Sequence, residues 1–105
     1  MISQRVDTVE AYAERRDALD QRWAGFLDEC GMAAIPIPNH PKTLSFILET
    51  IMPDGIVLSG GNSPVVYGGC APERDEIDNM LIEYSVQKKH LDRTKWCNDC
   101  VRMVQ

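Results

Sequence analysis

The sequence predicts an α/β domain built on a parallel sheet, because short apolar runs alternate with amphipathic helical segments. The clearest run is Ile-Val-Leu at 56–58, which is mostly β-branched and bounded by turn residues. Such a run is typical of a strand buried on both faces. The alternation gives the order β-α-β-α-β-α, and 105 residues suffice for one small domain.

Three strands are expected, near residues 1–5, 32–37 and 55–59. Between the first two, a helix is predicted over 15–30, where apolar residues recur at helical spacing, and Gly31 suits a left-handed C-cap. Pro36 and Pro38 mark the end of the second strand, since proline cannot donate to a central ladder.

Two further helices are predicted over 42–51 and 72–90. The first has an apolar stripe that ends before Pro53, and the second begins with Pro72, which lacks the N–H that a first helical turn leaves unpaired. A fourth strand is due after this helix. Residues 91–105 instead begin with charges and contain no long apolar run, so we expect a divergent tail without a strand.

Composition and charge exclude several classes of partner. The formal net charge of -5 argues against nucleic acid and anionic membranes, which reward basic surfaces. No apolar run approaches the roughly 20 residues that span a bilayer, and the N-terminus lacks the pattern of a signal peptide. We therefore expect a cytoplasmic protein with reduced cysteines.

The turn after the third strand is the main candidate site. Gly60 and Gly61 follow directly on 56–59, and paired glycines leave backbone N–H groups uncovered by any Cβ. Ligands of open α/β sheets bind at the carboxyl ends of strands, so this turn can offer donors to an oxyanion. The alternative is a tight turn that simply requires two glycines. No nucleotide P-loop follows, because no Gly-Lys-Ser or Gly-Lys-Thr is present.

The tail carries the sharpest local motif, Trp96-Cys97-Asn98-Asp99-Cys100. A Cys-x-x-Cys pair can be redox-active or supply half of a zinc site. Only five residues follow it, however, and Cys30, Cys70, His40 and His90 lack the paired spacing of further zinc ligands. His40, in an Asn-His-Pro turn, has no acid or cysteine near it in sequence and is interpreted as a loop histidine.

Several stretches, taken in order, resemble one family. They are Ile2-Ser3-Gln4-Arg5, Leu19-Asp20-Gln21-Arg22-Trp23, Ile35-Pro36-Ile37-Pro38, the run from Asp54 to Asn62, and Arg74-Asp75-Glu76. This order is similar to class I glutamine amidotransferase-like γ-glutamyl hydrolases, specifically the group with γ-glutamyl-γ-aminobutyrate hydrolase and γ-glutamyl-CDP-amidate hydrolase. The resemblance covers residues 1–90, which it makes the N-terminal half of a flavodoxin-like three-layer domain with a parallel sheet.

The resemblance implies hydrolysis of a γ-glutamyl amide through a cysteine nucleophile that a His-Glu pair activates. It implies an oxyanion hole at Gly60 and Gly61, substrate contacts at Asn62, Arg74 and Asp75, and no metal or cofactor. The family's Gly-x-Cys-x-Gly elbow and His-Glu pair are missing from this chain, and Cys97 and Cys100 lack the flanking glycines. The expectation is a truncated hydrolase that is inactive alone.

Two alternatives stay open: a small non-catalytic binding or regulatory module, and a Cys-x-x-Cys redox or zinc protein. A missing fourth strand would also leave the apolar strand at 56–58 as an open edge, with unpaired backbone groups. Self-association through that edge is therefore expected.

Overall fold

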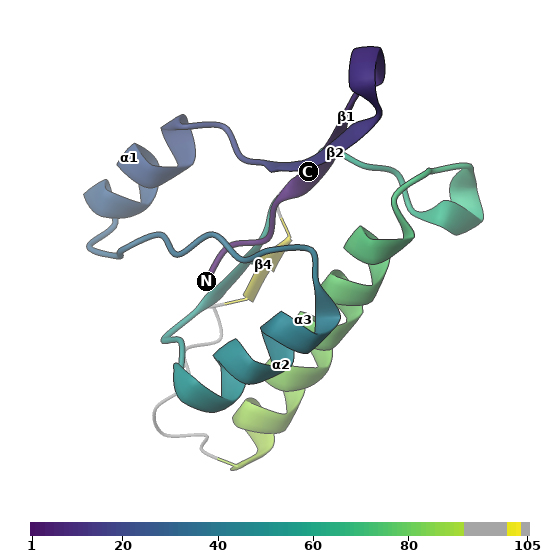
Figure 1. Ribbon diagram of the computed structural model, residues 1–105. Helices are drawn as coiled ribbons and strands as arrows, with labels where there is room; N and C mark the ends of the chain where they lie inside the picture. The colour runs from purple at the N-terminus through teal and green to yellow at the C-terminus, as the bar shows by residue number, and fades with distance from the viewer. Residues whose placement is uncertain (92–100, 104–105) are drawn as a thin grey trace.

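Two different two-stranded sheets and three α-helices form the structure, a computed structural model that describes residues 1–91 and 101–103 (Figure 1). The first sheet is antiparallel and pairs β1 (Arg5–Val9) with β2 (Glu14–Ala18). The second is parallel and pairs β3 (Ile56–Leu58) with β4 (Val101–Met103). The described chain is thus a small mixed α/β domain.

The sequence prediction is wrong for the N-terminal part of the first helix, where β1 and β2 form a hairpin instead. A 3-10 turn, η1 (Glu10–Tyr12), and a left-handed Ala13 with φ 51° reverse the chain. The predicted helix over 15–30 shrinks to α1 (Arg22–Glu29). Its first part fails because β2, with the sequence Glu-Arg-Arg-Asp-Ala, has no apolar stripe to bury in a helix and pairs with β1 instead.

The other two helices agree with their predicted positions. α2 spans Pro41–Thr50 and α3 spans Pro72–Leu91, so α3 continues past residue 90, where we placed the end of the family resemblance. His40 caps α2, with its Nδ1 accepting from the Thr43 N–H at 3.2 Å. Gly31, with φ 77°, takes the left-handed conformation expected after α1.

The apolar core lies between β3 and the helix pair α2 and α3. The largest of its fully buried members are Ile37, Leu44, Ile56, Ile77 and Leu81. α1 contributes only Leu27 to the buried residues. It lies apart from α2 and α3, on the other side of the N-terminal segment (Figure 1). In the described part of the chain, no helix combines the length and the apolar character needed to cross a membrane.

Parallel bridges join the first residues to both later segments. Ile2 bridges Pro36 on one side and Val57 on the other, both in parallel. The Ile2 N–H donates to Ile35 O at 3.0 Å, and the Ser3 N–H donates to Val57 O at 3.0 Å. Residues 1–3 therefore lie between segment 35–37 and β3, although only β3 is long enough to count as a strand.

The prediction that no strand follows α3 is wrong. β4 pairs in parallel with β3 in the register Ile56↔Val101, Val57↔Arg102 and Leu58↔Met103. Two β-branched or long apolar residues in a run of three suffice here, because β3 already offers an edge and α3 provides the crossover. β4 thus covers the edge of β3 along its whole length. Self-association through this edge stays a prediction, but the open edge on which it was based is not present.

Candidate functional site at the carboxyl end of β3

Two buried serines, Ser3 and Ser59, join the end of segment 1–3 to the end of β3. The Ser59 N–H donates to Ser3 Oγ at 2.9 Å, and the Ser59 hydroxyl donates to Ser3 O at 2.6 Å. Both serines are nearly inaccessible, with 0% and 6% of their surfaces exposed. Because these polar groups satisfy each other, the two chain segments end at a fixed level beside the Gly60-Gly61 turn.

The turn itself requires glycine at its second position. Gly61 has φ 129°, and a Cβ placed there would lie 2.7 Å from Arg5 Cδ. The close approach of the Arg5 side chain therefore excludes any larger residue. Gly60 and Gly61 are both exposed. Among the described residues neither N–H has a hydrogen-bond acceptor.

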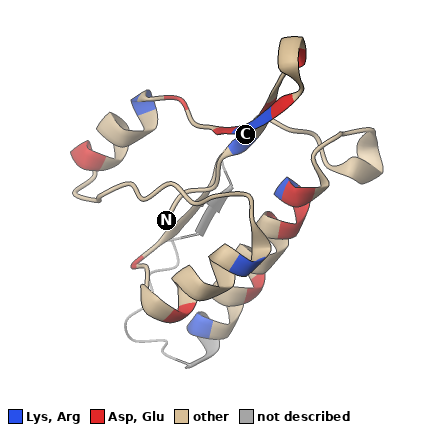
Figure 2. Cartoon of the chain, in the orientation of Figure 1, with Lys and Arg blue, Asp and Glu red and all other residues tan. Residues whose placement is uncertain are grey.

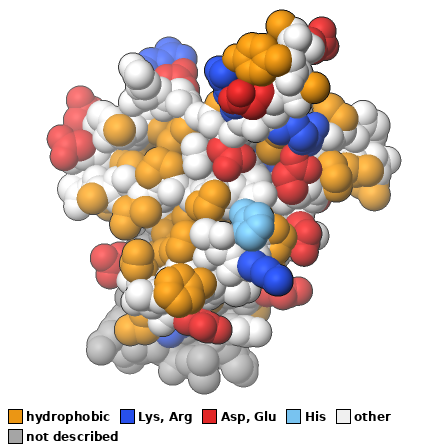
Figure 3. Space-filling view, viewed as in Figure 1, with side chains coloured by type: hydrophobic (Ala, Val, Ile, Leu, Met, Phe, Trp, Pro, Cys, Tyr) orange, Lys and Arg blue, Asp and Glu red, His pale blue; other side chains and the backbone are white. Residues whose placement is uncertain are grey.

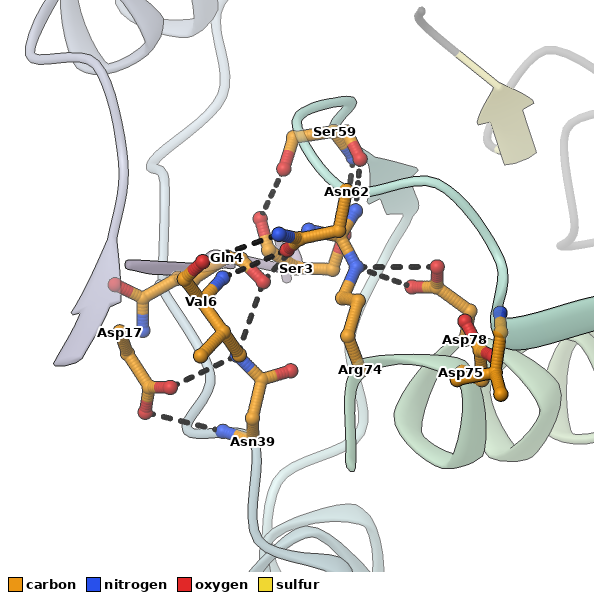
Figure 4. A network of polar contacts seen from close by, with 11 residues as sticks. Ser3, Gln4, Val6, Asp17, Asn39, Ser59, Asn62, Arg74, Asp75 and Asp78 are labelled. Atoms are coloured by element: carbon orange, nitrogen blue, oxygen red, sulfur yellow. Dashed lines mark hydrogen bonds and ion pairs between the residues drawn. The ribbon is translucent and has the colours of Figure 1, made fainter. Parts of the chain in front are cut away.

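Arg74 enters this region from the first turn of α3 and is only 3% exposed. Its guanidinium donates to Gln4 O at 2.7 Å, to Ser3 Oγ at 3.2 Å and to Ser59 O (Figure 4). Its Nε contacts both carboxylate oxygens of Asp78 at 3.1 Å. Burial raises the pKa of Asp78, and the positive charge of Arg74 opposes that rise. Arg74 therefore ties α3 to the ends of both chain segments.

Asn62 and Asp75 also bond to the protein's own backbone. The Asn62 amide forms a two-way pair with Val6, accepting from its N–H at 2.8 Å and donating to its carbonyl at 3.0 Å. Asp75 accepts from the Val65 N–H at 2.8 Å, which anchors the 3-10 turn η2 (Val65–Tyr67) to α3. The structure thus places Asn62 and Arg74 beside the Gly-Gly turn, and Asp75 behind η2.

Sequence reasoning missed the residues that complete this network. Gln4 donates from Nε2 to Ile37 O at 2.9 Å, while Asn39 donates to Gln4 O at 3.0 Å and to Asp17 Oδ1 at 2.8 Å (Figure 4). The signal that could have found Ser3 and Ser59 is a small polar residue immediately after an apolar strand segment. Nothing in the sequence signals the pairing of Asn39 with Asp17 across 22 positions.

One further contact fixes the hairpin over the start of α3. Arg15 on β2 forms an ion pair with Glu73 and donates to Cys70 O at 3.2 Å. Burial alone would raise the pKa of Glu73, but hydrogen bonds from Arg15 and from its own backbone N–H outweigh it and hold the pKa below the usual 4.5. The hairpin, the Gly-Gly turn and α3 are therefore linked at one end of the strands.

The described part of this edge has groups that can bind a negative charge, but it has no nucleophile beside a general base. It offers the backbone N–H groups of two exposed glycines and the Arg5 guanidinium, which is paired with Asp7 at 3.1 Å. The free cysteines in the described chain are Cys30 and Cys70, and no three metal-binding side chains cluster there. The predicted Cys97 and Cys100 motif lies outside the described residues, so its redox or zinc role stays a hypothesis.

Searches against protein-family models, curated proteins and solved structures found no match to this chain.

Proposed function

We propose that residues 1–90 are the N-terminal half of a class I glutamine amidotransferase-like γ-glutamyl amide hydrolase and form its oxyanion-binding part. The nucleophile and its His-Glu pair would come from polypeptide outside this chain. The observation that carries the proposal is the exposed Gly60-Gly61 turn at the carboxyl end of a parallel strand, where neither backbone N–H has an acceptor among the described residues.

The strand pairing supports the flavodoxin-like interpretation. Segment 35–37, residues 1–3, β3 and β4 neighbour one another in that order, and every bridge between them is parallel. This sequence of neighbours corresponds to the first four positions of the flavodoxin-like order 2-1-3-4-5. The Gly-Gly turn would then lie where such sheets bind their ligands.

The supporting chemistry is stabilisation of negative charge on a tetrahedral carbon. Two backbone donors held by a rigid turn need no reorganisation when an oxyanion forms. Ser3 and Arg74 supply that rigidity, because both bond the backbone of Ser59 immediately before the turn, and the Ser59 hydroxyl in turn donates to Ser3 O. Arg74 and Asn62 would accordingly position the turn rather than touch the substrate, which revises the roles that the family resemblance implied for them.

A γ-phosphonate analogue of glutamine tests the proposal, since its tetrahedral anion mimics the expected intermediate. We expect the amide NMR signals of Gly60 and Gly61 to shift saturably, while those of Gly25 and Gly31, which lie far from the turn, stay fixed. The chain alone should release no glutamate from γ-glutamyl amides. Uniform small shifts of all four glycines, or none, would reject an oxyanion site here.

A non-catalytic binding or regulatory module is the second candidate. The observation that favours it is that Asn62, Arg74 and Asp75 all direct their polar groups to the protein's own backbone. A module of this kind needs the rigid edge but not the exposed donors. Substituting alanine for Gly60 would then leave its partner binding intact, whereas the hydrolase proposal requires weaker binding of the phosphonate.

A further inference from the structure

An exposed ion pair on β1 lies beside the Gly-Gly turn. Arg5 Nη2 is 3.1 Å from Asp7 Oδ2, and the two side chains are 52% and 46% exposed. Figure 2 shows acidic and basic residues together along the hairpin, and in the space-filling view charged side chains of both signs lie next to one another at its surface (Figure 3). Because an exposed ion pair contributes little to stability, a charged ligand can replace it at low cost.

The turn and β1 are held together at Val6, between the two charged residues. The Val6 N–H donates to Asn62 Oδ1 at 2.8 Å, and Asn62 Nδ2 donates to Val6 O at 3.0 Å. Val6 is only 8% exposed, and successive side chains of a strand point to opposite faces. Arg5 and Asp7 therefore share the face of β1 opposite to Val6, at a level that Asn62 fixes relative to the turn.

The stem of the Arg5 side chain runs along the turn. A Cβ built on Gly61 would lie 2.8 Å from Arg5 Cβ and 2.7 Å from Arg5 Cδ. The guanidinium begins one bond beyond Cδ, so its positive charge lies beside the turn. A γ-glutamyl group spans about 5 Å from its γ-carbonyl carbon to its α-carboxyl carbon, along four carbon–carbon bonds. A substrate whose γ-carbonyl oxygen is held by Gly60 and Gly61 can thus place its α-carboxylate within reach of Arg5.

The charges of the pair match those of a free amino acid. An α-amino acid carries a carboxylate and an ammonium on one carbon, and its net charge is zero. An arginine guanidinium binds a carboxylate through two parallel N–H donors, whereas an ionised aspartate only accepts hydrogen bonds and suits an ammonium. Arg5 alone would attract any anion, and the neighbouring Asp7 adds a requirement for a cation beside that anion.

We propose that Arg5 binds the α-carboxylate, and Asp7 the α-ammonium, of the γ-glutamyl group whose γ-carbonyl lies at the Gly-Gly turn. The inference rests on the proposed hydrolase and names the two residues that would select substrates with a free α-amino acid end. A glutamine within a peptide, whose α-amino and α-carboxyl groups are both in amide bonds, would therefore bind poorly.

An NMR titration of the full chain with three phosphonate probes tests the proposal. The first probe is the γ-phosphonate analogue of glutamine with a free α-amino acid end, the second has an α-carboxamide, and the third has an N-acetyl group. The shifts of the Gly60 and Gly61 amide signals measure each affinity. We expect the carboxamide and N-acetyl probes each to bind at least about fivefold more weakly than the free form, since each loses one ion pair.

Substitutions of the pair should remove the two preferences separately. Arg5→Met keeps an apolar stem on Gly61 and should weaken the free probe about fivefold while leaving the affinity for the carboxamide probe unchanged. Asp7→Asn should likewise weaken the free probe and leave the N-acetyl probe unchanged. The matched control is Lys88→Met, which removes one positive charge near the other end of α3, about 20 Å from its first turn, and should change no affinity. Circular dichroism verifies that the variants fold.

The outcomes separate this assignment from the proposed hydrolase. Equal affinity of the wild type for all three probes would overturn the roles of Arg5 and Asp7 and leave the oxyanion site in place. Equal weakening of all three probes by Arg5→Met would overturn them too, because it would show that Arg5 only supports the turn. If no probe shifts the amide signals of Gly60 and Gly61, the proposed hydrolase itself is rejected, and the assignment with it.

Discussion

The two faces of β3 differ in how much of their apolar surface the described chain buries. On the face of α2 and α3, Leu44, Ile77 and Leu81 are each 0% exposed. On the face of α1, Phe26 is 51% exposed and Leu27 is the only buried residue of the helix. The layer of α2 and α3 thus buries apolar side chains that pack on β3, whereas the α1 layer leaves much of its apolar surface exposed.

The difference predicts which layer of helices holds the domain together. Burial of apolar side chains is the dominant favourable term in folding, so the layer of α2 and α3 should hold the domain together. The α1 layer contributes little burial and should open locally at low cost. Substitutions on the two faces should therefore have very different effects on the free energy of unfolding.

The largest effect is expected from Ile77→Ala in α3. Removing a fully buried isoleucine side chain leaves a cavity and should cost about 4 kcal/mol. Phe26→Ala in α1 is the matched change on the other face and should cost less than about 1 kcal/mol, because Phe26 is half exposed. Urea unfolding at neutral pH measures both, and equal losses would contradict the comparison.

Arg74→Met should follow, with a loss of about 3 kcal/mol. The substitution keeps the apolar stem but leaves Asp78 without its ion pair and the carbonyls of Gln4 and Ser59 without a donor. The Gly60 amide should also become displaced in NMR spectra. A variant as stable as the wild type would show that solvent replaces these contacts.

Helices α2 and α3 could be predicted from the sequence because their apolar residues recur at helical spacing. β3 and the Gly-Gly turn could be predicted for a similarly local reason, a β-branched run that ends at two glycines. The hairpin could not, since β2 is charged and exposed and its structure comes from pairing with β1. β4 was missed because three residues carry too little pattern.

The candidate site was predictable only at its centre. Gly60 and Gly61 are marked by their neighbours in sequence, whereas the partners of Arg74 and Asn62 are not. Arg74 bonds Gln4 across 70 positions, and Asn62 bonds Val6 across 56. No local pattern encodes such pairs, so a positioning arginine and a substrate-binding arginine look alike in the sequence.

Tyr84→Phe should raise stability by about 1 kcal/mol. The Tyr84 hydroxyl is buried beside the core and has no hydrogen-bond partner among residues 1–88, and burial raises its pKa. Removing the hydroxyl therefore removes an uncompensated desolvation cost while the ring keeps its packing. Thermal unfolding would measure the gain, and a loss of stability would indicate that the hydroxyl bonds to a group outside the described residues.

The smallest effect concerns pH and the contact between the hairpin and α3. Because the pKa of Glu73 is lowered in the folded state, its ion pair with Arg15 stabilises above the usual value of 4.5 and is lost as pH falls through the folded pKa. Glu73→Gln should cost about 0.5 kcal/mol at pH 7, since both side chains are partly exposed. Below both pKa values the variant and wild type should unfold alike; a difference that persists there would assign the loss to packing.

Amide hydrogen exchange tests the unequal layers most directly, because it reports the opening of each helix in the intact chain. We expect the amides of α1 (Arg22–Glu29) to exchange at least about a hundredfold faster, relative to unstructured peptide, than those at the centre of α3 around Ile77 and Leu81. Equal protection of α1 and α3 in the unliganded protein would contradict the account.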